Sequence, residues 1–446
     1  MKNLQTRATF KTDHLPSGTS NGPANDELRT RYARQGDLDG SPDGRQLDTL
    51  GLGEPPAFKP RFGLSNEGNS ERSAGAAGSA GCTVLDNNAK SSGNRSRRWE
   101  ARGFLWDYSE HVRVRKCGRV PVSSDGLVGV RANGESVGFA GLASCGSVWS
   151  CPVCNSRIQA VRRLEVGVAL ANVHANGGGA AFGAITVRHE LGQGLDGLLA
   201  ALTYGIARIA QDKTVKRLRA EMGHIGRVQA LEVTVGAYGW HPHRHPLALF
   251  SRPPDPGKLV QLHMAEFRAF RAGVVRRGYD APLDVAQFLQ PVTPGTGDVL
   301  GEYFTKSTYS HDAASWELTS TQTKKATGES RTPWELLDSA RKTGDMDDLD
   351  LWGEYERALK GKRALTYSRG LRDLVGLGTE STDEQIAGAE AGDKHDTGFW
   401  VSDWAPIRAH AQLGAGLLNA VTSAGNWAVG RKYAAAHGIP ILENEK

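Results

Sequence analysis

The sequence predicts an α+β fold, because segments that alternate like β-strands stand between segments with the apolar period of helices. Residues 229–235 and 239–250 predict two strands, and the glycines around the short stretch between them predict a tight turn. Residues 180–188 are a third strand candidate. The two adjacent strands are expected to pair as an antiparallel hairpin, in which directly opposed side chains share a face.

Helical segments surround these strands. Residues 156–176 predict a helix with an apolar stripe made of Ile158, Val161, Leu164, Val168 and Val173. Further helices are expected over 195–209, 259–274, 404–418 and 427–436, and another begins near residue 331. Strand-like segments are expected over 283–292 and 439–442.

Length and charge limit the class of protein. A chain of 446 residues exceeds the usual size of a single domain, so two or three units are expected. The net charge of +5 and the pI near 8.9 are compatible with nucleic-acid binding without requiring it. No apolar run has the length of a membrane span, and no signal-peptide core is evident, so a cytoplasmic protein is expected.

Composition divides the chain into four parts. Residues 1–94 are rich in small and polar residues and are expected to be a disordered tail. Residues 95–165 contain the cysteine module, residues 166–312 the predicted catalytic domain, and residues 313–446 a mostly helical, basic region suited to DNA. Within this last part, Lys360, Lys362, Arg363, Arg369 and Arg372 form a basic stretch, and residues 379–397 are expected to be an acidic linker.

Three histidines alternate along the second strand of the hairpin. His241, His243 and His245 therefore point to one face of an extended strand. If Glu232 on the first strand lies opposite His243 or His245, a carboxylate joins the imidazoles in a site for a divalent metal. The alternative is a solvated, histidine-rich strand that binds no metal.

Four cysteines predict a second metal site. A CxxC pair gives two thiolates to one ion, and two further cysteines complete a tetrahedral site with no open position. The four are Cys117, Cys145, Cys151 and Cys154. A closed site of this kind indicates structural zinc rather than catalysis; the alternative is four reduced cysteines.

A tyrosine and a lysine form the third candidate site. In a helix, Tyr303 and Lys306 would stand three residues apart on one face, where the ammonium group can reach the phenol or a phosphate beside it. A phenolate can attack phosphorus, but a tyrosine with its ordinary pKa of about 10 needs a cation or a metal nearby. Tyr309 would point elsewhere and is expected to serve packing.

Taken together, these segments resemble the three motifs of rolling-circle plasmid replication initiators (Rep proteins) of the HUH endonuclease superfamily. The cysteine module and two later segments resemble the version found on actinobacterial plasmids, and the similarity runs from about residue 98 to the C-terminus. The segments concerned are Thr186–His189, Gly239–His245, Tyr303–Lys306, Trp352–Tyr355 and Leu365–Arg372. The chain departs from the family pattern at Arg244 and Pro246, where aliphatic residues are usual.

The resemblance implies a central antiparallel sheet of the HUH type flanked by helices, with an N-terminal cysteine (zinc) module and a C-terminal helical region. It implies a metal-dependent endonuclease and strand transferase that nicks the plus strand at the plasmid origin through a phosphotyrosine and rejoins the ends at termination. Tyr303 would be the nucleophile and Lys306 its basic companion. His243, His245, Glu232 and, with less support, His241 would hold Mg²⁺ or Mn²⁺.

The partners implied are origin DNA, as a single strand or a hairpin at the nick site, and the host helicase and replication machinery, with no membrane. Three alternatives stay open from the sequence alone. One is a single-tyrosine HUH transposase or mobilisation relaxase, which shares the chemistry. Another is a zinc-containing DNA-binding regulator without catalytic activity. The third is a hydrolase whose metal activates water, so that no covalent adduct forms.

Overall fold

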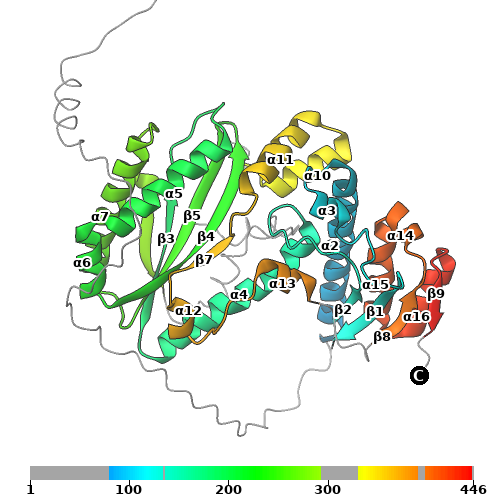
Figure 1. Ribbon diagram of the computed structural model, residues 1–446. Helices are drawn as coiled ribbons and strands as arrows, with labels where there is room; N and C mark the ends of the chain where they lie inside the picture. Colours follow the sequence, from blue (N-terminus) through cyan, green and yellow to red (C-terminus); the bar gives the residue numbers. More distant parts are fainter. Residues whose placement is uncertain (1–79, 134–135, 293–329, 390–396, 444–446) are drawn as a thin grey trace, which may run out of the picture. The chain divides into compact units, whose positions relative to one another are not determined.

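The computed structural model describes residues 80–133, 136–292, 330–389 and 397–443. These residues form two antiparallel sheets, each packed against helices (Figure 1). All of them belong to the larger of the two units into which the chain divides, Phe58–Lys446. The α+β class predicted from the sequence is confirmed.

The larger sheet has five antiparallel strands in the order β6-β3-β5-β4-β7. Their bounds are β3 Gly179–Thr186, β4 His224–Gly236, β5 Gly239–Phe250, β6 Phe288–Val292 and β7 Leu365–Tyr367. The first four lie in or overlap the segments predicted as strands. The long hairpin strand β5 is central, so its side chains have neighbours on both sides.

A two-residue loop joins β4 to β5. Gly236 and Gly239 are paired, which leaves Ala237 and Tyr238 between them. Gly239 has φ +87°, a left-handed conformation that glycine adopts without strain. The short loop fixes which residues of the two strands face each other, because a hairpin's register follows from its loop length.

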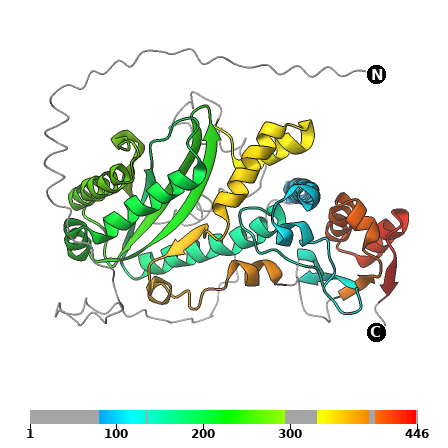
Figure 2. The same ribbon diagram turned by 45° about the horizontal axis from the view of Figure 1, so that its top comes forward.

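Helices cover both faces of this sheet. On one face lie α5 (Leu195–Gln211), α6 (Lys213–Glu221) and α7 (Pro256–Arg276), whose apolar residues share a core with Val233 and Phe250. On the opposite face lies α4 (Pro152–Ala175), which packs with Val228 and Leu247 (Figures 1 and 2). Core residues thus alternate between the faces along each strand, as the pleat requires.

The apolar stripe predicted for α4 is buried only in part: Ile158 and Val173 lie in the core, and the other three residues do not. Val161, Leu164 and Val168 are exposed, and Leu164 keeps 69% of its surface. The helix instead buries Arg162, among other residues, and pairs its guanidinium group with Glu165 and Asp383 at 2.9 and 2.8 Å. The buried side of α4 thus combines apolar residues with an arginine whose charge is neutralised by carboxylate partners.

A second, four-stranded sheet joins segments from distant parts of the chain. Its order is β2-β1-β8-β9, all antiparallel. The strands are β1 Val128–Asn133, β2 Ser136–Ala140, β8 Thr397–Val401 and β9 Ile441–Glu443. Their apolar side chains share a core with Trp99 and Trp404, in or beside flanking helices. The sequence did not predict this pairing.

Most of the remaining elements are helices near the cysteine module and the second sheet (Figure 1). They are α2 Ala80–Tyr108, α3 Val112–Lys116, α10 Pro333–Thr343, α11 Met346–Leu359, α13 Asp383–Gly388, α14 Ala405–Ala409, α15 Gln412–Ala424 and α16 Trp427–Ala436. The short helix α12 Leu371–Leu374 instead packs beside β4 of the large sheet. As predicted, α10 begins at a proline, and Thr332 and Glu335 cap it reciprocally.

Two boundaries differ from expectation. Helix α2 begins at Ala80, so the structured part starts before Arg95, and the rest of the expected tail lies outside the described residues. Helix α13 lies inside the segment expected to be an acidic linker, where Asp383 contributes to the ion pairs of Arg162. Among the described residues, no helix has the length and apolar composition that a membrane span needs.

A buried ion cluster joins α6, α7 and β4. Glu266 is 4% exposed, and its Oε1 accepts hydrogen bonds from Arg219 and Arg227, each with a contact of 2.6 Å. Burial alone would raise the pKa of Glu266, but the two guanidinium charges offset it and hold that pKa below its usual value.

We therefore expect Glu266→Gln to lower the free energy of unfolding by about 3 kcal/mol or more, because the buried Arg227 and the half-buried Arg219 lose their counter-charge. Urea unfolding of this variant and of Glu221→Gln, whose carboxylate pairs with Arg217 at the surface, measures the difference. Because the pKa of Glu266 is lower in the folded protein than in the unfolded chain, its charge stabilises the fold at pH values above the ordinary carboxyl pKa. This contribution to the free energy of unfolding is lost as the pH falls through the pKa of the folded protein. Equal stability of the two variants at neutral pH would contradict this account.

Candidate metal centre and cysteine cluster

The register of the hairpin brings the predicted metal ligands together. Glu232 on β4 is paired directly with His243 on β5, and Ala230, two residues earlier, is paired with His245. Because paired residues and residues two apart share a face, the carboxylate lies between the two imidazoles. The expectation that Glu232 lies opposite one of these histidines is confirmed.

The three side chains converge on one point. Glu232 Oε2 lies 3.2 Å from His243 Nε2 and 3.1 Å from His245 Nε2. Ligand atoms about 2.1 Å from one ion and at right angles to each other lie about 3.0 Å apart. The spacing therefore fits a divalent cation bound by all three.

Backbone carbonyls orient both imidazoles. His243 Nδ1 lies 3.2 Å from the carbonyl oxygen of His241, and His245 Nδ1 lies 3.3 Å from that of Gly183. Each Nδ1–H can donate to its carbonyl, which leaves each neutral ring with an unprotonated Nε2. Two nitrogen lone pairs and a carboxylate oxygen then face one another, an arrangement that favours a cation between them.

Pro246 lies at a gap in the pairing of β5 with β3, next to His245. The β3–β5 pairing is interrupted between Phe182–Leu247 and Ile185–Arg244, which is where Gly183 meets β5. Proline has no N–H to donate to β3, and the Gly183 carbonyl accepts from the His245 ring instead. The departure from the family pattern at Pro246 is thus compatible with the geometry of the site.

Electrostatics also favour a cation. Without an ion, burial raises the pKa of Glu232, but His243 in its charged form and hydrogen bonds from the Nε2–H groups of both histidines offset it and hold that pKa well below its usual value. A bound cation would replace those two protons and leave both rings neutral. Burial lowers the pKa of His245. The side chains of Glu232 and His243 remain 23% and 14% exposed, so a substrate oxygen can approach the ion from outside.

His241 lies beside this group and has different partners. Its Nε2 is 2.7 Å from Thr186 Oγ1, and its ring stacks on that of His189 with centroids 4.8 Å apart. The group of side chains whose ligand atoms lie within 4.8 Å of one another contains Glu232, His243 and His245 but not His241. Its carbonyl oxygen lies 3.2 Å from His243 Nδ1, and its role as a metal ligand stays a prediction.

The four cysteines of the second predicted site also meet. Cys117 ends α3, Cys145 lies in the loop after β2, and Cys151 and Cys154 stand at the start of α4. All four are buried, and their sulfur atoms lie within 4.8 Å of one another. The cluster occupies residues 117–154, so the expected N-terminal position is wrong: the module follows more than a hundred residues of chain.

The sulfur spacing fits one tetrahedral zinc ion. Cys117 Sγ lies 3.7 Å from Cys151 Sγ and 3.5 Å from Cys154 Sγ, and Cys145 Sγ lies 3.5 Å from Cys154 Sγ. Two sulfurs bound to one zinc at about 2.3 Å lie about 3.8 Å apart. Burial raises the pKa of the Cys151 thiol well above its usual range, a cost that a bound cation would remove by stabilising the thiolate.

Comparison with known proteins gives a family. The chain is 30% identical over 309 residues to a protein named "Protein rep" from Streptomyces lividans, an alignment that covers 56% of this chain and 67% of that relative. This chain belongs to the Streptomyces plasmid Rep-type proteins. It is also 30% identical over 150 residues to a "Neomycin resistance protein" from Streptomyces cyanogenus, over 28% of this chain and 34% of that relative. No family model and no solved structure matches the chain.

The third predicted site of this Rep protein cannot be placed. Tyr303, Lys306 and Tyr309 lie outside the described residues. What the structure does describe are the two flanks of that segment: Val292 ends the edge strand β6, and Arg331 forms a bridge with Val235 of β4.

Two supporting residues of the Rep protein went unrecognised in the sequence. Thr186 contacts His241, and Gln287 holds Thr186 by accepting from its N–H and donating to its carbonyl, at 3.0 and 2.9 Å. Thr186 belongs to the segment Thr186–His189, which resembles a motif of the initiators, and this resemblance was the signal that could have indicated its role. Gln287 lies far from the motifs, and no sequence pattern indicated it.

For the cysteine cluster, we expect the purified Rep protein to contain about one zinc per chain. Cys151→Ser should lower both the zinc content and the free energy of unfolding, because a ligand of a folding-coupled site is removed. Elemental analysis and thermal unfolding measure the two effects. A folded protein without zinc, or a Cys151→Ser protein with unchanged zinc content, would contradict the site.

For the histidines, we expect His241→Ala to keep most of the affinity for Mn²⁺ and His243→Ala to lose about tenfold or more, because His243, unlike His241, presents its ring to Glu232. Titration with Mn²⁺, followed calorimetrically, separates the two. Equal losses would make His241 a ligand as well.

Proposed function

We propose that this Rep-type protein initiates rolling-circle plasmid replication by nicking the plus strand at the origin, and that it rejoins the ends at termination. The observation that carries the proposal is the convergence of Glu232, His243 and His245 on a partly exposed part of the sheet. In a family of plasmid replication proteins, a divalent-metal site of this kind suits phosphate chemistry on DNA.

A bound Mg²⁺ or Mn²⁺ would polarise the scissile phosphate and stabilise the charge that develops on it. The chain's own residues hold the site in shape: Glu232 supplies the negative charge, and the carbonyls of His241 and Gly183 fix both imidazoles. This preorganisation matters, because a site that must rearrange during the reaction loses much of its electrostatic effect.

In the proposed reaction the Tyr303 oxygen attacks phosphorus. A phosphotyrosine bond forms to the 5′ end, the bond to the leaving oxygen breaks, and that oxygen becomes the 3′-hydroxyl that primes synthesis. Lys306 would favour the phenolate and contact the phosphate by its positive charge. Because the phosphodiester energy is kept in the covalent bond, reversal of the step rejoins DNA ends.

Chain connectivity is compatible with this role for Tyr303. Val292 at the end of β6 pairs with Ala180 of β3, which pairs with Leu249 of β5. Leu249 is about six residues, or roughly 20 Å, from His243 along β5. Tyr303 follows Val292 by about eleven residues, a reach of up to roughly 36 Å. The covalent path is therefore long enough to bring the phenol to the metal ligands.

The proposal includes origin DNA as substrate, presented as a single strand or a hairpin, the host helicase and replication machinery as partners, and the cytoplasm as the place of action. The similarity to a protein named Rep favours replication over a transposase or a relaxase of the same chemistry. The partly exposed ligand group favours an enzyme over a DNA-binding regulator without activity.

Tyr303→Phe tests the proposal directly. The ring remains but the attacking oxygen is lost, so we expect DNA binding to persist while nicking and the covalent adduct disappear. Incubation with a single-stranded origin oligonucleotide and Mn²⁺, followed by denaturing electrophoresis, detects the adduct. Tyr309→Phe is the matched control and should keep its activity.

His243→Ala and His245→Ala should also abolish nicking, but by the loss of charge stabilisation rather than of the nucleophile. Excess divalent metal can then restore part of the activity of a single histidine variant, whereas it cannot restore the Tyr303→Phe protein. An adduct formed by Tyr303→Phe but not by Tyr309→Phe would reassign the nucleophile, and full activity of all four variants would end the proposal.

A further inference from the structure

A groove of about 740 Å³ lies between the cysteine module and the loop that leads into β7. One wall is formed by residues 110–114 and 145–150, and the other by residues 359–363 and Leu365, with parts of α13 and Arg162 completing it. Its volume is in the range of pockets that enclose a small molecule, about 300–1,000 Å³, so it can take in a few nucleotides but not a duplex.

The groove adjoins the metal site on the same face of the sheet. Leu365 lines the groove and pairs with Ala230 of β4, which in turn pairs with His245. Two strand spacings, about 10 Å, therefore separate the backbone at Leu365 from that at His245. Leu365, Ala230 and α4 share one apolar cluster, which fixes the face, and Phe182 of the same cluster stacks on the His245 ring.

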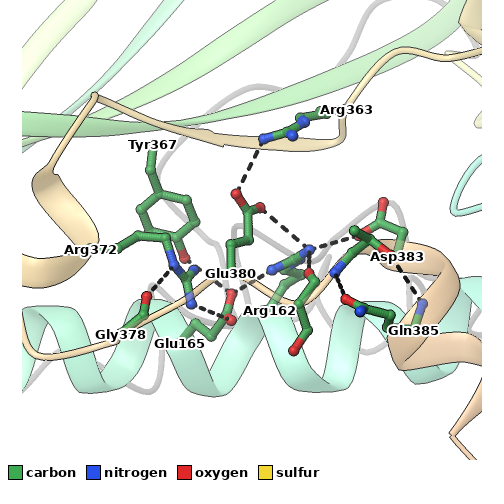
Figure 3. Close-up of polar contacts among 11 residues, drawn as sticks. Arg162, Glu165, Arg363, Tyr367, Arg372, Gly378, Glu380, Asp383 and Gln385 are labelled. Carbon is green, nitrogen blue, oxygen red and sulfur yellow. Dashed lines mark hydrogen bonds and ion pairs between the residues drawn. The ribbon is translucent and has the colours of Figure 1, made fainter.

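Both walls are held by specific contacts. The indole N–H of Trp149, in the cysteine module, donates to the carbonyl of Lys362 at 2.7 Å. On the other side, Arg162 binds Asp383 at 2.8 Å and Glu380 at 3.5 Å, which ties α4 to the segment around α13 (Figure 3). The loop that carries the cations, residues 360–363, is thus attached to the cysteine module at Lys362.

The cations of the loop are available for a ligand, whereas the acids of the groove are paired. Glu110 pairs with Arg357, Glu384 with Arg113, and Asp383 with Arg162. Lys360 is exposed and has no ion-pair partner among the residues that the structure describes. Within the described part of the chain, the one ion pair of Lys362 is a 3.9 Å contact to an exposed aspartate.

Arg363 completes the set. Its side chain is 66% exposed, and among the residues described it forms an ion pair with Glu380 at 3.2 Å (Figure 3). Glu380 already has Arg162 as a second cationic neighbour, so Arg363 can turn to a phosphate without leaving a buried charge unpaired.

We propose that this groove binds the segment of single-stranded DNA next to the scissile phosphate, with Lys360, Lys362 and Arg363 contacting its phosphates. The inference rests on the proposed nicking function and adds the path of the strand: from the Glu232–His243–His245 site, over the edge of the sheet at β7, to the cysteine module. It also gives the cysteine cluster a role, since Trp149 positions the loop that binds the strand.

The test is equilibrium binding of a fluorescent oligothymidylate of about 25 nucleotides to the full-length chain. The protein carries Tyr303→Phe, so that covalent chemistry does not interfere. We expect Lys360→Glu with Lys362→Glu to weaken binding about tenfold and to reduce the slope of log affinity against log salt by about 1.4, the value for two lost phosphate contacts on a single strand. The conservative pair Lys360→Arg with Lys362→Arg should bind like the unsubstituted protein.

A matched control changes two exposed arginines on the opposite side of the large sheet, Arg268→Glu with Arg271→Glu on α7. It has the same change in charge and should bind the oligothymidylate with little loss. Unchanged affinity of the lysine variant, or an equal loss in the α7 variant, would overturn the proposal. An equal loss for a duplex of the same length would overturn the assignment to a single strand. Because no nicking is measured, these outcomes are independent of whether Tyr303 proves to be the nucleophile.

Discussion

The register of one hairpin is the constraint on which the candidate site depends. The two-residue loop between Gly236 and Gly239 pairs Glu232 with His243, and the side-chain alternation of strands then adds His245. A slip of one residue would turn the carboxylate to the face covered by α5 and α7, where it would meet apolar side chains instead of imidazoles. The loop length thus decides whether a metal site exists at all.

The backbone around the site has a second role beyond holding the sheet together. Two carbonyls that orient the imidazoles belong to β3 and β5 themselves, and the one at Gly183 meets β5 where a proline has no N–H to donate. Helix α4 covers the apolar part of this face up to Phe182 and His245, where the apolar cluster ends and the polar site begins. Rigid elements therefore position the ligands, while one side of them stays open to substrate.

Local patterns in the sequence were sufficient for the hairpin, for the pairing of Glu232 with a histidine and for the set of four cysteines. They failed where a residue's partner lies far away in the chain. The periodicity of α4 favoured Leu164 for the core, but Arg162 is buried because carboxylates from residue 380 onward neutralise it. The pairing of β1 with β8 has the same cause, since neither strand carries a signal that names its partner.

That second sheet constrains when the molecule can finish folding. Arg131 on β1 donates a hydrogen bond to Thr397 on β8, a residue 266 positions later in the chain. At the usual pace of translation, roughly 5–20 residues per second, β1 waits about 13 to 50 s for its neighbour to leave the ribosome. During that interval the edge of β1 that later pairs with β8 is open to strands of other chains. A nascent copy can therefore mispair at β1 even after the histidine hairpin has been synthesised.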